Sequence, residues 1–184
     1  MRKNIGSKPM LFPMPVLIVG SYDENGKANA MNAAWGGIAD TDQILICMSE
    51  HKTTENIKKK NAFTVSIGTA ATVTACDYVG IVSAKDESEK IKKAGLTPVK
   101  SQVVDAPLFA ELPLALECEL IQIIDGEKYL GRIKNVSVDD CILDEDGNID
   151  VFKLNPIIYE TARHGYHVFG ERIADAFKVG AKLK

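Results

Sequence analysis

The sequence contains neither a pair of closely spaced cysteines nor an apolar run long enough to cross a membrane. Its four cysteines, at positions 47, 76, 118 and 141, include no C-x-x-C motif, which excludes a zinc knuckle and a thioredoxin-like redox centre. Prolines at positions 9, 13 and 15 interrupt the N-terminal apolar stretch, and no small-residue cleavage site follows it. We therefore expect a soluble, cytoplasmic protein with reduced thiols and no membrane partner.

The sequence also lacks the charge and the short motifs that mark several common functions. The formal net charge is −3 and the isoelectric point is about 5.7, which argues against a nucleic-acid partner. There is no G-x-G-x-x-G or Walker-type loop, and Ser, Cys and His are too scattered to suggest a nucleophilic triad. His164 and His167 have metal-ligand spacing but no third ligand nearby. These patterns therefore give no metal site and leave the catalytic residues unknown.

The residues that are present predict a mainly β fold with short helices. Apolar, β-branched runs are separated by turn signals such as Asn25-Gly26 and Asp125-Gly126, which is typical of hairpins. Strands are expected at 15–22, 27–37, 43–49 and 62–68 and on both sides of the turn at Asp125-Gly126. Short helices are expected at 54–60, 86–95 and 171–184. Because no long crossovers separate the strands, we expect one domain, residues 1–184, with an antiparallel sheet that closes into a barrel.

The stretch S-E-H-K-T-T-E-N-I-K-K-K, residues 49–60, places small polar groups where a strand ends and a helix begins. Thr54 suits the N-cap position, and the first N–H groups of a helix attract anions. This predicts a cradle for one phosphate group, and the alternative is that Thr54 only caps the helix while Lys52 points to water. The candidate residues of this stretch are Ser49, His51, Lys52, Thr53, Thr54 and Asn56.

Two further stretches could contact a ligand. Small side chains in N-A-M-N-A-A-W let a flat ligand approach the strand, and Trp35, the only tryptophan, could form a wall. A tight strand crossing with Trp35 in the core is the alternative. The candidates here are Asn29, Ala30, Met31, Asn32, Ala33, Ala34 and Trp35. Ser83 and Lys85 precede a helix start and form a second possible anion site, or else a solvent-facing loop with Asp86 and Glu89 as a capping box.

Taken together, these stretches resemble the flavin reductase family with the FMN-binding split-barrel fold, and within it the flavoredoxin-like branch. The resemblance covers nearly the whole chain, from P-V-L-I-V-G-S-Y near the N-terminus to H-V-F-G-E-R-I-A-D-A-F near the C-terminus. It implies an antiparallel split β-barrel that binds FMN across a homodimer interface. It also implies that residues 29–35 meet the flavin ring and ribityl chain, and that the Ser49, Lys52, Thr54, Asn56 pattern borders the phosphate. Ala84 stands where many relatives have glycine, while Lys85 keeps a positive charge.

The resemblance implies an FMN-binding oxidoreductase that passes electrons from NADH or NADPH through FMN to free flavin or another acceptor. Backbone amides near residues 30–34, or the side chain of Asn32, could stabilise the reduced flavin without a charged group. Two alternatives remain open. One is an FMN electron carrier that serves a redox protein partner, and the other is a binding module without redox function.

Overall fold

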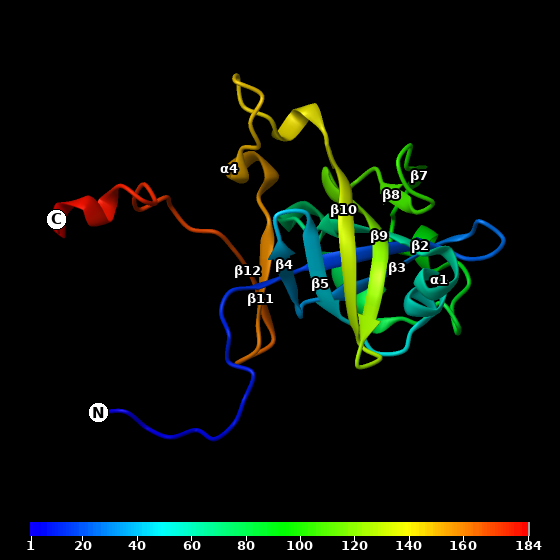
Figure 1. Ribbon diagram of the computed structural model, residues 1–184, viewed down its shortest axis with the longest axis horizontal. Helices are drawn as coiled ribbons and strands as arrows, with labels where there is room; N and C mark the ends of the chain where they lie inside the picture. Colours follow the sequence, from blue (N-terminus) through cyan, green and yellow to red (C-terminus); the bar gives the residue numbers. More distant parts are fainter. Residues whose placement is uncertain (184) are drawn as a thin grey trace.

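The computed structural model describes residues 1–183, and its main feature is a seven-stranded antiparallel sheet (Figure 1). The sheet curls into a half-barrel, which confirms the predicted mainly β, antiparallel fold class. The strand order is β3-β2-β6-β9-β10-β5-β4, so β3 and β4 form the two edges. The strands are β2 (Leu17–Tyr22), β3 (Ala28–Ala33), β4 (Gly36–Asp40), β5 (Gln43–Cys47), β6 (Ala62–Ile67), β9 (Leu114–Ile124) and β10 (Lys128–Val138).

Two tight turns set the register of the main hairpins. Gly26, with a φ of 77°, joins β2 to β3, and Asp23 accepts hydrogen bonds across this turn from two backbone N–H groups. Asp125 and Gly126 both have positive φ, 52° and 81°, at the turn between β9 and β10. The predicted strand 27–37 is interrupted at Ala34 and Trp35, because the chain there passes from one edge of the curled sheet to the other.

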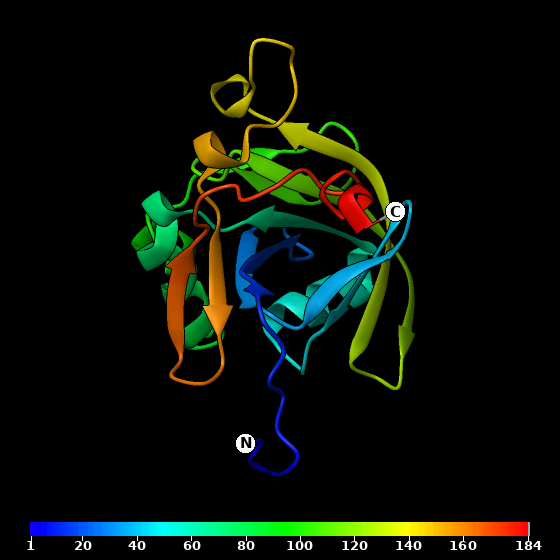
Figure 2. The same cartoon turned by 90° about the vertical axis from the view of Figure 1, so that its left-hand side faces the viewer.

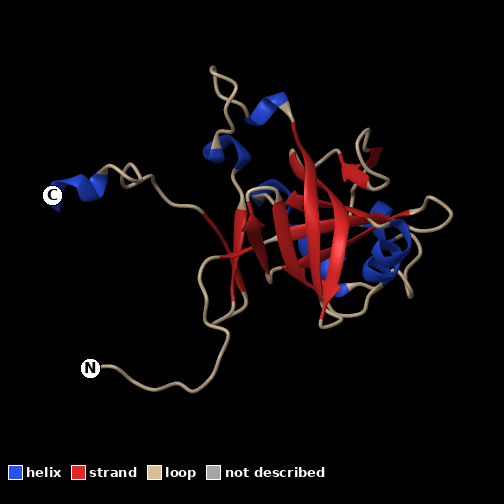
Figure 3. Ribbon diagram, viewed as in Figure 1, coloured by secondary structure: helices blue, strands red, loops and turns tan. Residues whose placement is uncertain are grey.

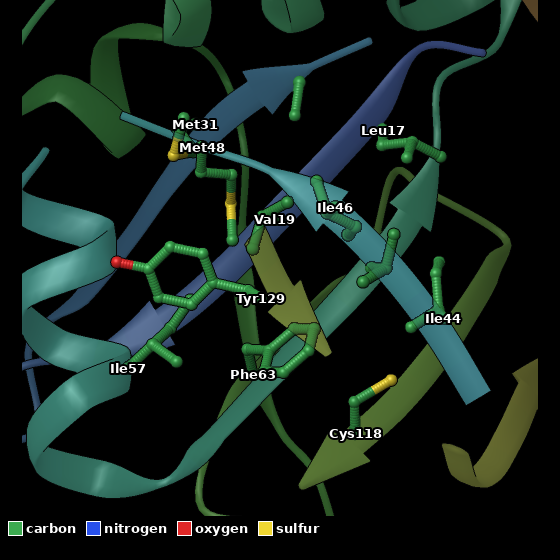
Figure 4. Close-up of a cluster of buried hydrophobic side chains, with 12 residues drawn as sticks. Leu17, Val19, Met31, Ile44, Ile46, Met48, Ile57, Phe63, Cys118 and Tyr129 are labelled. Atoms are coloured by element: carbon green, nitrogen blue, oxygen red, sulfur yellow. The ribbon is translucent and has the colours of Figure 1, made fainter. Parts of the chain in front are cut away.

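The interior of the half-barrel is filled by side chains from the concave face of the sheet and from one helix (Figure 4). Tyr129 and Phe63 are almost completely buried there, and Ile57 reaches them from α1 (Lys52–Lys60). Leu17 and Val19 of β2 point to this interior, whereas Ile18 between them belongs to a second cluster on the other face. The strict alternation along β2 therefore places one apolar layer on each side of the sheet.

Helices cover the second layer and the ends of the strands (Figure 3). The second cluster packs α2 (Val73–Ile81) and α3 (Lys90–Lys93) against the outer face of β2 and β3. The remaining helical turns are α4 (Val151–Leu154), η1 (Ala70–Thr72), η2 (Asp140–Ile142) and η3 (Val179–Leu183). Within residues 1–183, no helix has the length and apolar character that a membrane span needs.

Two small sheets complete the fold. One has the order β1-β11-β12 and packs beside α2; its strands are β1 (Met14–Pro15), β11 (Ile157–Glu160) and β12 (Gly165–Val168). The other pairs β7 (Pro98–Lys100) with β8 (Pro107–Phe109). Both terminal segments leave the barrel on the same side, as the two perpendicular views show (Figures 1 and 2).

Three predicted helices differ from the structure. The helix expected at 54–60 begins at Lys52 with His51 as its N-cap, because the Thr54 side chain bonds back to the His51 backbone N–H. The helix expected at 86–95 is regular only over Lys90–Lys93, and no capping box joins Asp86 to Glu89. For residues 171–184 the sequence predicts a short amphipathic helix with a loose tail, but residues 171–183 form only turns and η3. The apolar side chains Ile173 and Phe177 are fully exposed, so no packing surface stabilises a longer helix there.

Candidate functional site

The candidate site runs along the free edge of β3. This strand pairs only with β2, so its outer backbone groups are not used by the sheet. The carbonyl of Ala30 points outward, and in an antiparallel ladder every second residue directs both N–H and C=O the same way. Asn32 therefore also presents its backbone groups to the edge. Helix α1 flanks this edge on one face of the sheet, and α2 and α3 flank it on the other.

A cleft of about 140 Å³ lies along this edge, and we call it the helix cleft. Its walls are the start of α1, the end of α2 and the loop that follows α2. Its lining residues are Asn29, Met31, Asn32, His51, Lys52, Thr53, Val79, Gly80, Ile81, Val82, Ser83, Ala84 and Lys90. None of these residues is acidic, whereas two are lysines, so the cleft is electropositive. A smaller cavity of about 80 Å³ shares Asn29, Lys52 and Lys90 with it.

Lys90 is the most unusual residue of the cleft. Its side chain is only 4% exposed, and its ammonium group donates a 2.7 Å hydrogen bond to the outward carbonyl of Ala30. Burial lowers the pKa of Lys90 to about 8. A buried lysine is costly without a partner, and its contact with an edge carbonyl is a reason to expect a functional role.

Asn29 provides a second unusual feature. Its side-chain N–H donates to the Thr53 hydroxyl at 2.8 Å, but its oxygen is buried without any hydrogen-bond partner. Both Asn29 and Thr53 are at least 95% buried. Since buried polar atoms are nearly always paired, this oxygen is an acceptor to which a ligand N–H or O–H group could donate. The pairing of Asn29 with Thr53 also fixes the orientation of the amide.

The start of α1 forms one end of the cleft. The Thr54 hydroxyl accepts from the His51 backbone N–H at 2.8 Å and donates to the His51 carbonyl at 2.9 Å, so it serves the helix cap and does not line the cleft. The prediction that Thr54 is the N-cap is wrong, because its side chain folds back over the preceding turn. Ser49 is exposed and lies 3.1 Å from His51 Nε2. Lys52 and Thr53 do line the cleft.

The remaining predicted residues fall into two groups. Asn56 is buried, donates to the Ser21 hydroxyl at 3.2 Å and lines the smaller cavity, while Ser83 lines the helix cleft. Lys85 instead forms a 2.5 Å ion pair with Glu55 across the mouth, outside both linings. This ion pair links α1 to the loop that follows α2, a contact that the residues around Ser83 did not indicate in the sequence.

The predicted ring-binding stretch is divided by the pleat of β3. Asn32 lines the cleft and donates a 3.0 Å hydrogen bond to the Cys76 carbonyl in α2. Ala33 faces the barrel core, and Met31 borders both the core and the cleft. Trp35 is 54% exposed at the crossing between the sheet edges and lines none of the described cavities. The alternative that Trp35 is a core residue is therefore wrong for this subunit.

Sequence reasoning did not identify Lys90 or Gly80. Lys90 lies in a run of lysines, and nothing in that run distinguishes the buried one. Gly80 permits close contact between helix and strand, since a Cβ there would lie 3.0 Å from Cβ of Asn32. The apolar residues Ile91 and Leu96, which follow Lys90, are the sequence signal that this short helix packs against the sheet.

Within residues 1–183, no group of three or more His, Cys, Asp or Glu side chains is placed to hold a metal ion. The flavin reductase like domain model matches residues 10–166.

The chain belongs to this family.

Two solved structures of flavin reductase-like proteins are particularly similar. The flavoredoxin of Desulfovibrio vulgaris (Miyazaki F) is 37% identical and superposes with a TM-score of 0.93, covering 98% of this chain and 100% of that chain. The flavoredoxin from Methanosarcina acetivorans is 22% identical with a TM-score of 0.89 over the full length of both chains, which supports the fold alone. The predicted flavin reductase-like split barrel is therefore confirmed.

The chain also has an uncharacterised sequence relative. An uncharacterised protein of Aeropyrum pernix is 29% identical over 138 residues, which cover 71% of this chain. The match spans about half, 52%, of that relative's own length. The printed name of this relative states no activity or substrate.

Proposed function

We propose that the chain binds FMN in the helix cleft and uses it to pass electrons from NADH or NADPH to an acceptor. The observation that carries this proposal is the unpartnered oxygen of Asn29, buried beside Lys90 in a cleft without acidic residues. Such a combination suits a ligand with both a hydrogen-bond donor and negative charge close to it. FMN has both, in the hydroxyls of its ribityl chain and in its phosphate.

The phosphate end of FMN fits the electrostatics at the start of α1. The N–H groups in the first turn of a helix have no partner within the helix, and the helix dipole adds partial positive charge. Lys52 and Thr53 lie in this turn, and both line the helix cleft. We infer that Lys52 and the backbone of this turn hold the phosphate, with Ser83 on the opposite wall.

The ring of FMN fits the edge of β3. Outward backbone groups at Ala30 and Asn32 can pair with a polar ring edge, and the small residues of this strand allow close approach. When bound, FMN supplies the redox chemistry, so the protein needs to bind, orient and polarise it. Lys90 can place positive charge near the ring without a side-chain rearrangement, because its ammonium group is already hydrogen-bonded to the Ala30 carbonyl.

We further propose that the protein acts as a homodimer. The helix cleft holds about 140 Å³, whereas sites that bury a ligand of this size commonly have roughly 300–1,000 Å³. A second subunit that covers the cleft would supply the missing wall. Trp35, at the crossing that follows β3, is 54% exposed, and Ile38, on the other edge strand β4, is 68% exposed. Both are suited to such a contact.

The first test is an absorbance spectrum of protein that has been incubated with excess FMN and desalted. The sample is then titrated with NADH and NADPH without oxygen. Retained flavin bands that bleach with one nucleotide support the proposal and identify the donor. A protein that retains no flavin and does not accelerate flavin reduction in a steady-state assay contradicts it.

The second candidate is an FMN electron carrier that serves a redox protein. It is favoured by the 37% identity to a flavoredoxin over nearly the whole chain. In this case the bound flavin stays oxidised in the presence of either nucleotide but is reduced by dithionite. The same titration therefore distinguishes the two candidates.

A further inference from the structure

A second cleft lies between α2 and the β11–β12 hairpin and opens beside the helix cleft. We call it the hairpin cleft; it holds about 330 Å³. It shares Asn32, Gly80 and Ile81 with the helix cleft, so a molecule in one would lie next to a molecule in the other. Its distinctive side chains are three rings and one carboxylate, those of Tyr159, His164, Tyr166 and Asp77.

One hydrogen-bonded pair gives this cleft a fixed wall. The Tyr166 hydroxyl donates to Asp77 Oδ1 at 2.8 Å, which ties the hairpin to α2. Burial, together with this carboxylate, raises the pKa of Tyr166 to about 12, so the phenol stays protonated near neutral pH. Tyr166 is therefore a rigid aromatic surface and not a proton source.

The second pair has different chemistry. The Tyr159 hydroxyl lies 2.6 Å from His164 Nδ1, and the two rings are stacked with an angle of 28° between their planes. When the hydroxyl donates to Nδ1, the proton of the neutral imidazole is on Nε2, where it can be given to a ligand oxygen.

The backbone holds this imidazole in place. His164 has a positive φ of 59°, and the Glu160 carboxylate accepts backbone hydrogen bonds from Ala162, Arg163 and Gly165 in the same turn. Positive φ is uncommon for residues other than glycine, although asparagine, aspartate and histidine adopt it more often than the rest. The turn is thus tied at several points, which keeps the His164 ring at the cleft.

We propose that the hairpin cleft binds the electron acceptor, as a planar conjugated carbonyl compound. His164 donates a hydrogen bond to its oxygen through Nε2, and Tyr159 holds the imidazole in this tautomer. The aromatic walls suit a flat ring, and the imidazole suits a carbonyl oxygen. This inference rests on the proposed function, because it requires flavin in the adjoining helix cleft. Two-electron reduction adds a hydride at carbon and a proton at oxygen. Reduced flavin bound in the helix cleft would supply the hydride, and His164 Nε2 would donate the proton.

The test is calorimetric titration of acetophenone into the protein with and without bound FMN. Cyclohexyl methyl ketone, which has the same carbonyl but a puckered ring, is the matched ligand control. We expect acetophenone to bind in both forms, to perturb the flavin absorption of the loaded form, and to bind at least about tenfold more tightly than the control.

Two variants locate the site. His164→Asn keeps a residue that tolerates positive φ, and Tyr159→Phe keeps the ring but removes the hydroxyl. Each should weaken acetophenone binding by about tenfold while FMN affinity stays within twofold. His167→Asn, on the same hairpin but outside the cleft lining, is the control and should change neither affinity.

Several results would overturn the inference. Acetophenone that displaces FMN would mean that the hairpin cleft is part of the flavin site. Equal affinity for the two ketones, absence of binding, or unchanged affinity in both variants would contradict the ligand class. If acetophenone binds with the expected variant pattern but the chain takes up no FMN, the proposed function fails and the acceptor role with it, while the ligand class of the cleft stands.

Discussion

At the scale of single residues, the site depends on two polar groups whose environment is set by distant parts of the chain. The oxygen of Asn29 lacks a partner, and the ammonium of Lys90 has only a carbonyl. Burial of each group costs free energy, and each would gain a further hydrogen bond from a bound ligand. Substitutions at these positions therefore separate stability from binding.

Replacing Asn29 with leucine removes the unpaired oxygen and keeps a similar volume. We expect FMN affinity to fall at least about tenfold, because a hydrogen bond to the ligand is lost. The FMN-free protein should lose about 1 kcal/mol of stability, because the buried hydrogen bond from the Asn29 amide to the Thr53 hydroxyl is lost as well. FMN titration followed by flavin fluorescence, together with thermal unfolding, measures both. An affinity like that of the wild type would show that this oxygen does not face the ligand.

Replacing Lys90 with methionine tests its titration. The pKa is about 8 in the folded state and about 10.4 in an unfolded chain, so between these values the unfolded chain binds more protons. The cost of burying the charge is therefore full below pH 8 and is relieved as the pH rises toward 10.4. We expect the FMN-free wild type to gain stability relative to Lys90→Met between pH 7 and pH 9.5 in urea unfolding. Parallel pH profiles would contradict the buried ammonium.

At the scale of elements, the first turn of α1 contains both a residue that caps the helix and residues that line the helix cleft. The Thr54 hydroxyl accepts the capping hydrogen bond from the His51 backbone. The Thr53 hydroxyl accepts from the Asn29 amide, and Lys52 lines the cleft. The sequence pattern placed all of these residues around one anion, since successive polar residues at a helix start look alike. The direction of each side chain is decided by the true N-cap, His51.

Replacing Thr54 with valine should reduce the free energy of unfolding by about 1 kcal/mol, the usual cost of a lost helix cap. Thr54→Ser keeps the hydroxyl and should recover most of this loss. Urea unfolding of the three proteins provides the comparison. If instead Thr54→Val left stability unchanged and only weakened FMN binding, the Thr54 hydroxyl would belong to the ligand site after all.

At the scale of the whole molecule, the terminal segments carry apolar side chains that this subunit does not cover. Leu11 and Phe12 at one end, and Ile173 and Phe177 at the other, are all more than half exposed. The segments leave the barrel on the same side (Figure 1). Exposed apolar groups in this number point to an interaction surface, in line with the proposed homodimer.

The double variant Ile173→Asp with Phe177→Asp should therefore weaken self-association by at least about tenfold, measured by sedimentation equilibrium. Its urea unfolding midpoint, extrapolated to the monomer, should match that of the wild type, because neither side chain packs on the barrel. Lys178→Ala, in the same segment, is the control and should associate normally. Undiminished association of the double variant would remove this segment from the interface.

The sequence by itself was sufficient for the mainly β class, the two tight hairpin turns and the family. Turns such as Asn25-Gly26 depend on local φ preferences, and alternating apolar residues define strands wherever they pair. Only the tertiary structure decided that β3 is an edge strand, that Lys90 reaches Ala30 across sixty residues of chain, and that the segment 171–183 finds no surface on which to form a helix. Edges, burial and unpaired polar atoms depend on long-range pairing, which no local pattern encodes.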